Sequence, residues 1–258
     1  MESPPNRIDA DVTGPADAPQ VVLIHGSLDR SAGMARLARE LSAHWRVLRY
    51  DRRGYGRSRP HDGPFDVASQ VDDLLTLLDG EPAVLVGHSF GGHVALAAAA
   101  RVPGLVTGVS VYETPLSWMD WWPSGTAGGM AAMSSDADAA ENFMRRLIGN
   151  DGWEALPERT RQERRSEGVA LRAELLSIRG GAPWDADSVA CRVVCGHGSE
   201  GSPHHARGMS WLAARLRRGS AAVIQGAGHG APNSHPGPFA RAMVDVHRDR
   251  PADGAALA

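Results

Sequence analysis

Residues 83–92 read Ala-Val-Leu-Val-Gly-His-Ser-Phe-Gly-Gly, and this stretch decides the fold. An apolar, β-branched run ends in the motif Gly87-His88-Ser89-Phe90-Gly91, and a helix-forming stretch from Val94 to Arg101 follows at once. A G-x-S-x-G motif between a strand and a helix is typical of a nucleophile elbow, a turn too tight for side chains at its two glycines. The same letters also suit an ordinary glycine-rich turn with a surface serine, so the rest of the chain must distinguish the two.

Composition places the chain among ordinary globular proteins. Its 258 residues suit one large domain, with 42% hydrophobic and 22% charged residues and a net charge of −3. This balance gives no broad basic surface for nucleic acid, and no apolar run is long enough to span a bilayer. Residues 1–12 carry prolines and acids where a signal peptide would have a basic start and an apolar stretch. We therefore expect a cytoplasmic protein that binds neither nucleic acid nor a membrane; nothing in the sequence indicates an oligomeric state.

The basic and sulfur-containing residues exclude several kinds of chemistry. All 27 basic residues are arginine, so a Schiff-base lysine, a pyridoxal phosphate anchor and a Walker loop are ruled out. Cys191 and Cys195 fall in one expected strand about 13 Å apart, too far for a disulfide. The pair His204-His205 could be part of a metal site, but a solvated helix start is the favoured interpretation. We expect no metal and no cofactor.

Apolar runs and amphipathic stretches alternate along most of the chain. This alternation predicts a mostly parallel α/β sheet with helices on both faces. The first 14 residues could add an antiparallel edge hairpin. The expected strands are Gln20–His25, Trp45–Asp51, Ala83–Gly87, Leu105–Tyr112, Ala190–Cys195 and Ala221–Ile224, and the expected helices are Ala32–Ala43, Val67–Leu78, Gly92–Arg101, His204–Arg217 and Pro238–Asp245.

One long stretch interrupts this alternation. Residues 114–187 contain no convincing strand, and we interpret them as a helical cap inserted into a core of residues 1–113 and 188–250, with 251–258 as a flexible tail. Aromatic and sulfur-containing side chains gather early in this stretch, and they could form an apolar pocket wall or simply pack the cap on the core. The candidate pocket residues are Trp118, Met119, Trp121 and Trp122.

A serine nucleophile needs a base and an oxyanion site. His229 lies in the glycine-rich stretch Gly226-Ala227-Gly228-His229-Gly230, just after the last expected strand, and is the candidate base. The backbone N–H of Phe90, which follows Ser89, is one candidate oxyanion donor. The other is the N–H of Ser27, with Leu28 as the alternative, in the loop after strand Gln20–His25.

With these motifs the chain resembles the α/β-hydrolase superfamily, in particular its capped members that act on small molecules. The matching stretches, in this order, are Leu23–Gly26, Asp51–Ser58, Gly87–Gly92 and Gly226–His229. The resemblance covers roughly residues 20–113 and 190–247. It implies that Asp51 shapes the turn after its strand and takes no part in catalysis.

The acid of the expected triad departs from the superfamily's usual pattern. The acid commonly follows the strand that corresponds to Ala190–Cys195, but that turn reads Gly196-His197-Gly198-Ser199 here, with serine in place of aspartate and Glu200 one position late. Some members of the superfamily, haloalkane dehalogenases among them, take the acid from the end of the preceding strand. Glu113 stands at that point in this sequence, where a carboxylate would be buried and would need a partner such as an imidazole N–H. Glu113 is therefore the preferred acid and Glu200 the alternative.

The resemblance implies hydrolysis of an ester-like bond in a small, apolar substrate. Ser89 would form an acyl-enzyme, His229 would move the proton and Glu113 would orient His229. The same residues could serve C–C bond, thioester, lactone, perhydrolase or acyl-transfer chemistry, and a protein with a degenerate site could merely bind a ligand.

Overall fold

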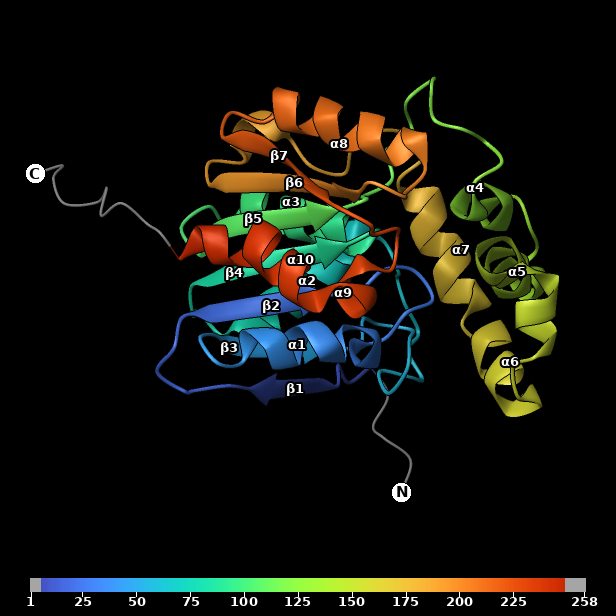
Figure 1. Cartoon of the computed structure of the whole chain (residues 1–258). Coiled ribbons are helices and arrows are strands. Elements are labelled where there is room, and N and C mark those ends of the chain that lie inside the picture. Colours follow the sequence, from blue (N-terminus) through green and yellow to red (C-terminus); the bar gives the residue numbers. More distant parts are fainter. Residues whose placement is uncertain (1–5, 249–258) are drawn as a thin grey trace, which may run out of the picture.

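The structure, a computed structural model, describes residues 6–248 and contains one seven-stranded sheet in the order β1-β3-β2-β4-β5-β6-β7 (Figure 1). Every neighbouring pair is parallel except β1 and β3. The tail expected at 251–258 lies outside the described residues. The strands are β1 (Ala10–Thr13), β2 (Gln20–Ile24), β3 (Arg46–Tyr50), β4 (Ala83–His88), β5 (Val106–Tyr112), β6 (Arg192–Gly198) and β7 (Gly219–Ile224).

Helices cover both faces of the sheet, which is why the central strands read as continuous apolar runs. All residues of β2 and β4 are buried. One face packs against α2 (Val67–Leu78), α3 (Gly91–Arg101) and α8 (Pro203–Arg215). The other face packs against α1 (Ala35–Leu41) and the C-terminal turns that begin with α9 (Ala231–Ser234) and α10 (Pro236–Phe239).

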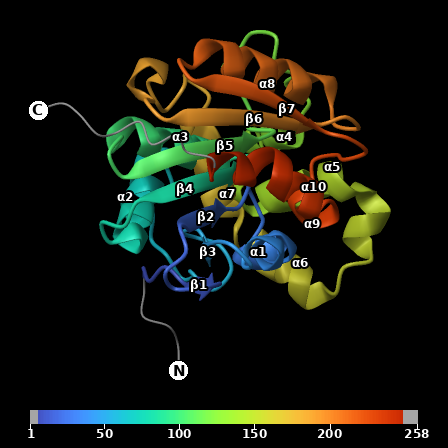
Figure 2. The same cartoon turned by 60° about the vertical axis from the view of Figure 1, so that its left-hand side comes forward.

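The stretch between β5 and β6 is helical and lies to one side of the sheet, as Figures 1 and 2 show. No strand occurs between residues 114 and 187, all of which belong to the described part of the chain. We call residues 114–187 the helical segment. Its helices are α4 (Ala127–Ala132), α5 (Asp136–Glu154, with a kink at Gly149), α6 (Glu158–Arg165) and α7 (Gly168–Ser177).

Two expectations about the strands were wrong in detail. The N-terminal strand β1 is an antiparallel edge strand, as expected, but it pairs with β3 and is not part of a hairpin. Strand β6 extends to Gly198, because Gly196, His197 and Gly198 pair with β7 and are not yet part of a turn. Within residues 6–248, no helix combines the length and the apolar character needed to cross a membrane.

Candidate active site

The ends of three parallel strands, β4, β5 and β7, bring the candidate catalytic residues to one cavity. Ser89 directly follows β4, Glu113 directly follows β5, and His229 lies in the loop after β7. All three line a cavity of about 590 Å³. Since parallel strands end at the same edge of a sheet, residues 140 positions apart along the chain become neighbours there.

The turn after β4 has the backbone of a nucleophile elbow. Ser89 adopts a left-handed conformation with a φ of 52°, and its N–H donates to the carbonyl of Tyr112 at 2.8 Å. A Cβ at Gly87 would lie 2.5 Å from the carbonyl oxygen of Gly91, and a Cβ at Gly91 would lie 2.3 Å from that of Ile24. The two outer glycines of the motif are therefore required by close backbone contacts, and the turn holds Ser89 at the cavity wall.

Glu113 and His229 form a hydrogen bond. Nδ1 of His229 lies 2.7 Å from Oε2 of Glu113, whose side chain is fully buried, and the N–H of Gly198 donates to Oε1 at 3.0 Å. Burial opposes ionisation of the carboxyl, but its contacts with His205 and His229 outweigh burial and hold the pKa of Glu113 well below its ordinary value. An ionised carboxylate only accepts, so Nδ1 of His229 carries the proton and Nε2 is left with a lone pair.

A hydrogen bond from His88, the residue before Ser89, fixes the backbone of the loop that contains His229. Nε2 of His88 donates to the backbone carbonyl of His229 at 2.9 Å, and the two rings are 4.6 Å apart. Burial, followed by the nearby His229, lowers the pKa of His88 to about 3, so that His88 stays neutral. No hydrogen bond joins the Ser89 hydroxyl to His229 in this conformation; contacts between a nucleophile and its base often form only when substrate is bound.

The alternative acid makes no such contact. Glu200 lines the same cavity, but it is exposed, and its carboxylate forms no hydrogen bond or ion pair with His229. The serine that stands where aspartate was expected has a structural partner, because Ser199 Oγ accepts from the N–H of Gly226 at 2.9 Å. The structure thus brings Glu113, and not Glu200, to the histidine.

The loop after β2 presents free backbone donors beside the elbow. A Cβ at Gly26 would lie 2.9 Å from the Cβ of Ser89, so the loop touches the nucleophile turn. Within residues 6–248, the N–H groups of Ser27, Leu28 and Phe90 have no hydrogen-bond acceptor. Ser27 lines the cavity, whereas Leu28 is buried and has a φ of 52°. This arrangement favours Ser27 over Leu28 as the second candidate donor.

Comparison with known proteins agrees with this geometry. Residues 21–242 match the profile described as "Alpha/beta hydrolase family". The chain belongs to the alpha/beta hydrolase family. Its fold is also that of the solved esterase from Thermogutta terrifontis (TM-score 0.72, 23% identity, 91% of this chain and 90% of that one) and of the enol-lactonase from Burkholderia xenovorans LB400 (TM-score 0.66, 22% identity, 91% and 94%).

Curated sequence relatives of this alpha/beta hydrolase match only part of the chain. Lipase LipV of Mycobacterium tuberculosis is 37% identical over 103 residues, 39% of each chain. The 2-(acetamidomethylene)succinate hydrolase of Mesorhizobium japonicum is 34% identical over 106 residues, 40% of this chain and 38% of that protein. These matches span about two fifths of each relative.

Three residues stabilise the loop that contains Ser27 in this hydrolase, and this role was not predicted for any of them from the sequence. His25 is fully buried; its Nδ1 donates to the carbonyl of Gly26 and its Nε2 accepts from the N–H of Arg52. Arg52 donates in turn to the carbonyls of His25 and Gly26. The third is Glu174 of α7, which accepts from the Ser27 hydroxyl at 2.6 Å and from Arg52 at 2.7 Å. His25 and Arg52 lie in the Leu23–Gly26 and Asp51–Ser58 motifs, whereas Glu174 lies in none. Asp51 itself accepts hydrogen bonds from the backbone N–H groups of Ser31 and Arg57.

The candidate pocket residues divide between the cavity wall and the packing of the helical segment. Of the four candidate pocket residues, only Trp122 lines the cavity. Trp118 packs on the core between His93 and Trp184, Trp121 lies under Arg207, and Met119 is half-buried. The lining is mixed, with apolar Ala127, Ala132, Phe143, Leu147, Leu175 and Ile178 and with polar Ser117, Ser124, Thr126, Arg146, Arg179 and His204.

The pair His204-His205 is not a solvated helix start. Helix α8 does begin at Pro203, but both histidines are half-buried and line the cavity. Nδ1 of His205 lies 2.8 Å from Oε2 of Glu113, and the His205 and His229 rings are stacked with centroids 5.2 Å apart. The donor atoms of Glu113, His205 and His229 lie within 4.8 Å of one another, which makes this trio the candidate metal-binding group of the site.

Proposed function

We propose that this protein is a serine hydrolase that cleaves an ester-like bond of a small substrate through an acyl-enzyme. Ser89 attacks the carbonyl carbon, and Nε2 of His229 takes the hydroxyl proton and then delivers it to the leaving group. Glu113 holds the tautomer of His229 and stabilises the imidazolium that forms. The N–H groups of Phe90 and Ser27 bind the oxyanion, and water then attacks the acyl-enzyme with His229 as the base.

The observation that carries this proposal is the hydrogen bond between Glu113 and His229 at the wall that also holds Ser89. A buried carboxylate 2.7 Å from Nδ1 leaves Nε2 as the only basic ring nitrogen, which is the state that a general base requires. The left-handed backbone of Ser89 and the free donors of the two loops support the same assignment.

The proposed nucleophile can be tested with a fluorophosphonate probe followed by peptide mapping. We expect covalent labelling at Ser89, because the probe reacts with a serine that a neighbouring base activates. The Ser89→Ala variant should neither be labelled nor hydrolyse p-nitrophenyl butyrate. Ser27→Ala is the matched control, since its hydroxyl also lines the cavity but donates to Glu174, and it should still be labelled at Ser89. A folded wild-type protein that resists the probe would exclude the assignment.

The mixed lining favours a substrate with an apolar body and an acidic group. Arg146 and Arg179 both line the cavity, and within residues 6–248 neither forms an ion pair with a carboxylate. A substrate carboxylate could accept charge-assisted hydrogen bonds from them. Replacing Arg179 by Gln should raise KM for a hemisuccinate p-nitrophenyl ester about fivefold, which corresponds to the loss of about 1 kcal/mol at an exposed charge. The same substitution should leave KM for the neutral butyrate ester unchanged. Equal effects on both esters would contradict an acidic substrate.

A further inference from the structure

The proposed triad needs one histidine, but two histidines contact the same carboxylate oxygen of Glu113. Nδ1 of His229 is 2.7 Å and Nδ1 of His205 is 2.8 Å from Oε2 of Glu113. The two rings are nearly parallel, with an angle of 18° between their planes, so both present the same edge to Glu113. Nothing in the serine mechanism uses His205.

The contact between His205 and Glu113 lacks the geometry of a hydrogen bond. Despite the distance of 2.8 Å, Nδ1 of His205 is buried and has no hydrogen-bond partner among residues 6–248. The His205 side chain is only 15% exposed, so bulk water does not compensate. A buried polar atom without a partner is unfavourable, and an ion bound at that point is one of the recognised explanations. Ligands of a shared ion direct their lone pairs at the ion and not at each other.

We propose that Glu113, His205 and His229 bind a Zn²⁺ ion, and that the bound ion reversibly inhibits the hydrolase. Two imidazoles and a carboxylate are a frequent ligand set for zinc, with the fourth position left to water, and here all three ligand residues line the cavity. Zinc–ligand distances of about 2.0–2.2 Å place tetrahedral ligand atoms about 3.3 Å apart. The two short contacts to Oε2 therefore need to open by about half an ångström, while the two Nδ1 atoms, which lie within 4.8 Å of each other, need to come to a similar separation.

Inhibition follows from the tautomer that the ion requires. Zinc binds the lone pair of Nδ1, so the proton of His229 moves from Nδ1 to Nε2 and no bond to a substrate is formed or broken. With Nε2 protonated, His229 has no lone pair left for the Ser89 proton. Glu113 is at the same time engaged by the ion. This inhibitory effect rests on the proposed function, whereas binding of the ion does not.

The binding site can be tested by calorimetric titration of chelator-treated protein with ZnCl₂. We expect one Zn²⁺ per chain both in the wild type and in Ser89→Ala, and a higher Tm for each in zinc. Loss even of an outer-shell partner costs about 10- to 100-fold in metal affinity, so His205→Asn should bind at least about tenfold more weakly. His44→Asn, at an exposed histidine, is the matched control and should bind like the wild type. MgCl₂ should give no binding, because magnesium prefers oxygen ligands.

Hydrolysis of p-nitrophenyl butyrate provides the second measurement. Zinc should stop turnover of the wild type and EDTA should restore it, while His205→Asn should need at least about tenfold more zinc for the same fractional loss. Absence of zinc binding, or equal binding in the wild type and His205→Asn, overturns the proposal; His205→Gln serves if the first variant does not fold. Zinc binding to a wild-type protein without hydrolase activity would support the metal site and refute the proposed function, so the two failures are distinguishable.

Discussion

Three residues at or next to the cavity have a strained, left-handed backbone conformation. Leu28, Ser89 and Glu113 have φ values of 52°, 52° and 48°, and only two other non-glycine residues in 6–248 have a positive φ. Such conformations cost of order 1–3 kcal/mol each and persist where surrounding contacts enforce them. Two of the three are enforced by backbone hydrogen bonds, from Ser89 to Tyr112 and from Glu113 to Gly196. The strained turn at Glu113 matches the one at Ser89, as expected if both residues serve the same site.

The role of Glu113 can be separated from that of Glu200 by matched substitutions. Glu113→Gln should lower kcat by about 10²- to 10⁴-fold, because a neutral amide neither fixes the tautomer of His229 nor stabilises its protonated form. Glu200→Gln should change kcat by less than about twofold, since Glu200 is exposed and does not contact the histidine. Steady-state kinetics on p-nitrophenyl butyrate decides between the two acids. A larger loss in Glu200→Gln would assign the acid to Glu200.

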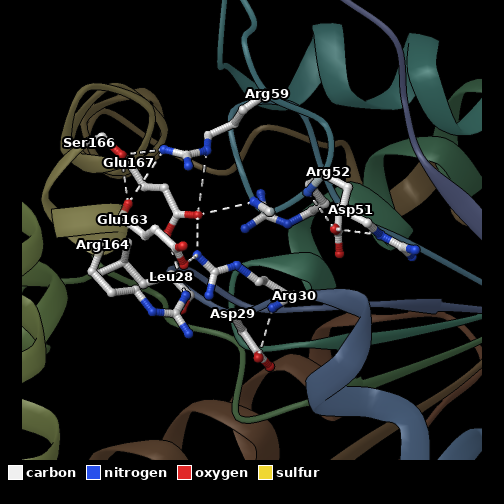
Figure 3. A network of polar contacts seen from close by, with 12 residues as sticks. Leu28, Asp29, Arg30, Asp51, Arg52, Arg59, Glu163, Arg164, Ser166 and Glu167 are labelled. Atoms are coloured by element: carbon white, nitrogen blue, oxygen red, sulfur yellow. Dashed lines mark hydrogen bonds and ion pairs between the residues drawn. The ribbon is translucent and has the colours of Figure 1, made fainter. Parts of the chain in front are cut away.

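At the scale of elements, polar contacts join the helical segment to the core. In Figure 3, Glu167 at the start of α7 faces Arg30 and Arg59 from core loops and Arg164 from α6. Both Glu167 and the nearby Glu174 are fully buried. Buried carboxylates are tolerated only when paired, so these contacts fix where α6 and α7 lie over the loop that contains Ser27.

Loss of Glu174 should destabilise the fold strongly. Glu174 and Arg52 are both fully buried and 2.7 Å apart, so Glu174→Ala leaves a buried guanidinium without its partner. Breaking such a pair from one side costs about 3–5 kcal/mol of unfolding free energy. Urea unfolding measures the loss. Asp187→Ala removes an ion pair with Arg215 that is largely exposed, and should cost less than about 1 kcal/mol; comparable losses in the two variants would contradict the assigned role of the buried pair.

Elements defined by local pattern were predicted well. The helix expected at Val67–Leu78 has those bounds, and each expected strand begins and ends within three residues of the observed one. Apolar runs bounded by turn residues suffice for this, because burial on both faces requires them locally. The pairing partner of β1 was not predictable in this way, since a four-residue edge strand has too few side chains to specify it.

Contacts between distant elements were predicted only where a motif signalled them. Glu113 was found because it ends a buried strand next to the elbow. Glu174 and Arg52 are 122 positions apart and Glu174 lies in no motif, so their pairing could not be inferred from spacing. His205 was seen but assigned to solvent, because helical periodicity does not say which face of α8 meets the cavity. The tryptophans likewise predicted packing, but the sequence did not show which residues they would pack against.

At the scale of the whole molecule, one buried histidine joins the two ends of the helical segment to the core. His93 of α3 is fully buried; its Nε2 donates to the carbonyl of Pro115, and its Nδ1 accepts from the indole N–H of Trp184 at 3.3 Å. Pro115 lies at the beginning of the segment and Trp184 near its end. Both ring nitrogens are therefore satisfied only in the neutral form, and a proton on Nδ1 would face another N–H group.

This contact should make the whole fold sensitive to acid. Burial lowers the pKa of His93 to about 3, against about 6.5 in the unfolded chain, so between these values the unfolded state binds more protons. The stabilising contribution is complete above pH 6.5 and falls by about 1.4 kcal/mol per pH unit as the pH drops toward 3. His93→Gln should be less stable than the wild type at pH 7, but should lose about 1.4 kcal/mol less per unit between pH 6 and 5. Urea unfolding at these three pH values measures the difference, and His44→Gln, at an exposed position, is the control. If His93→Gln lost as much unfolding free energy between pH 6 and 5 as the wild type, His93 would not titrate on unfolding.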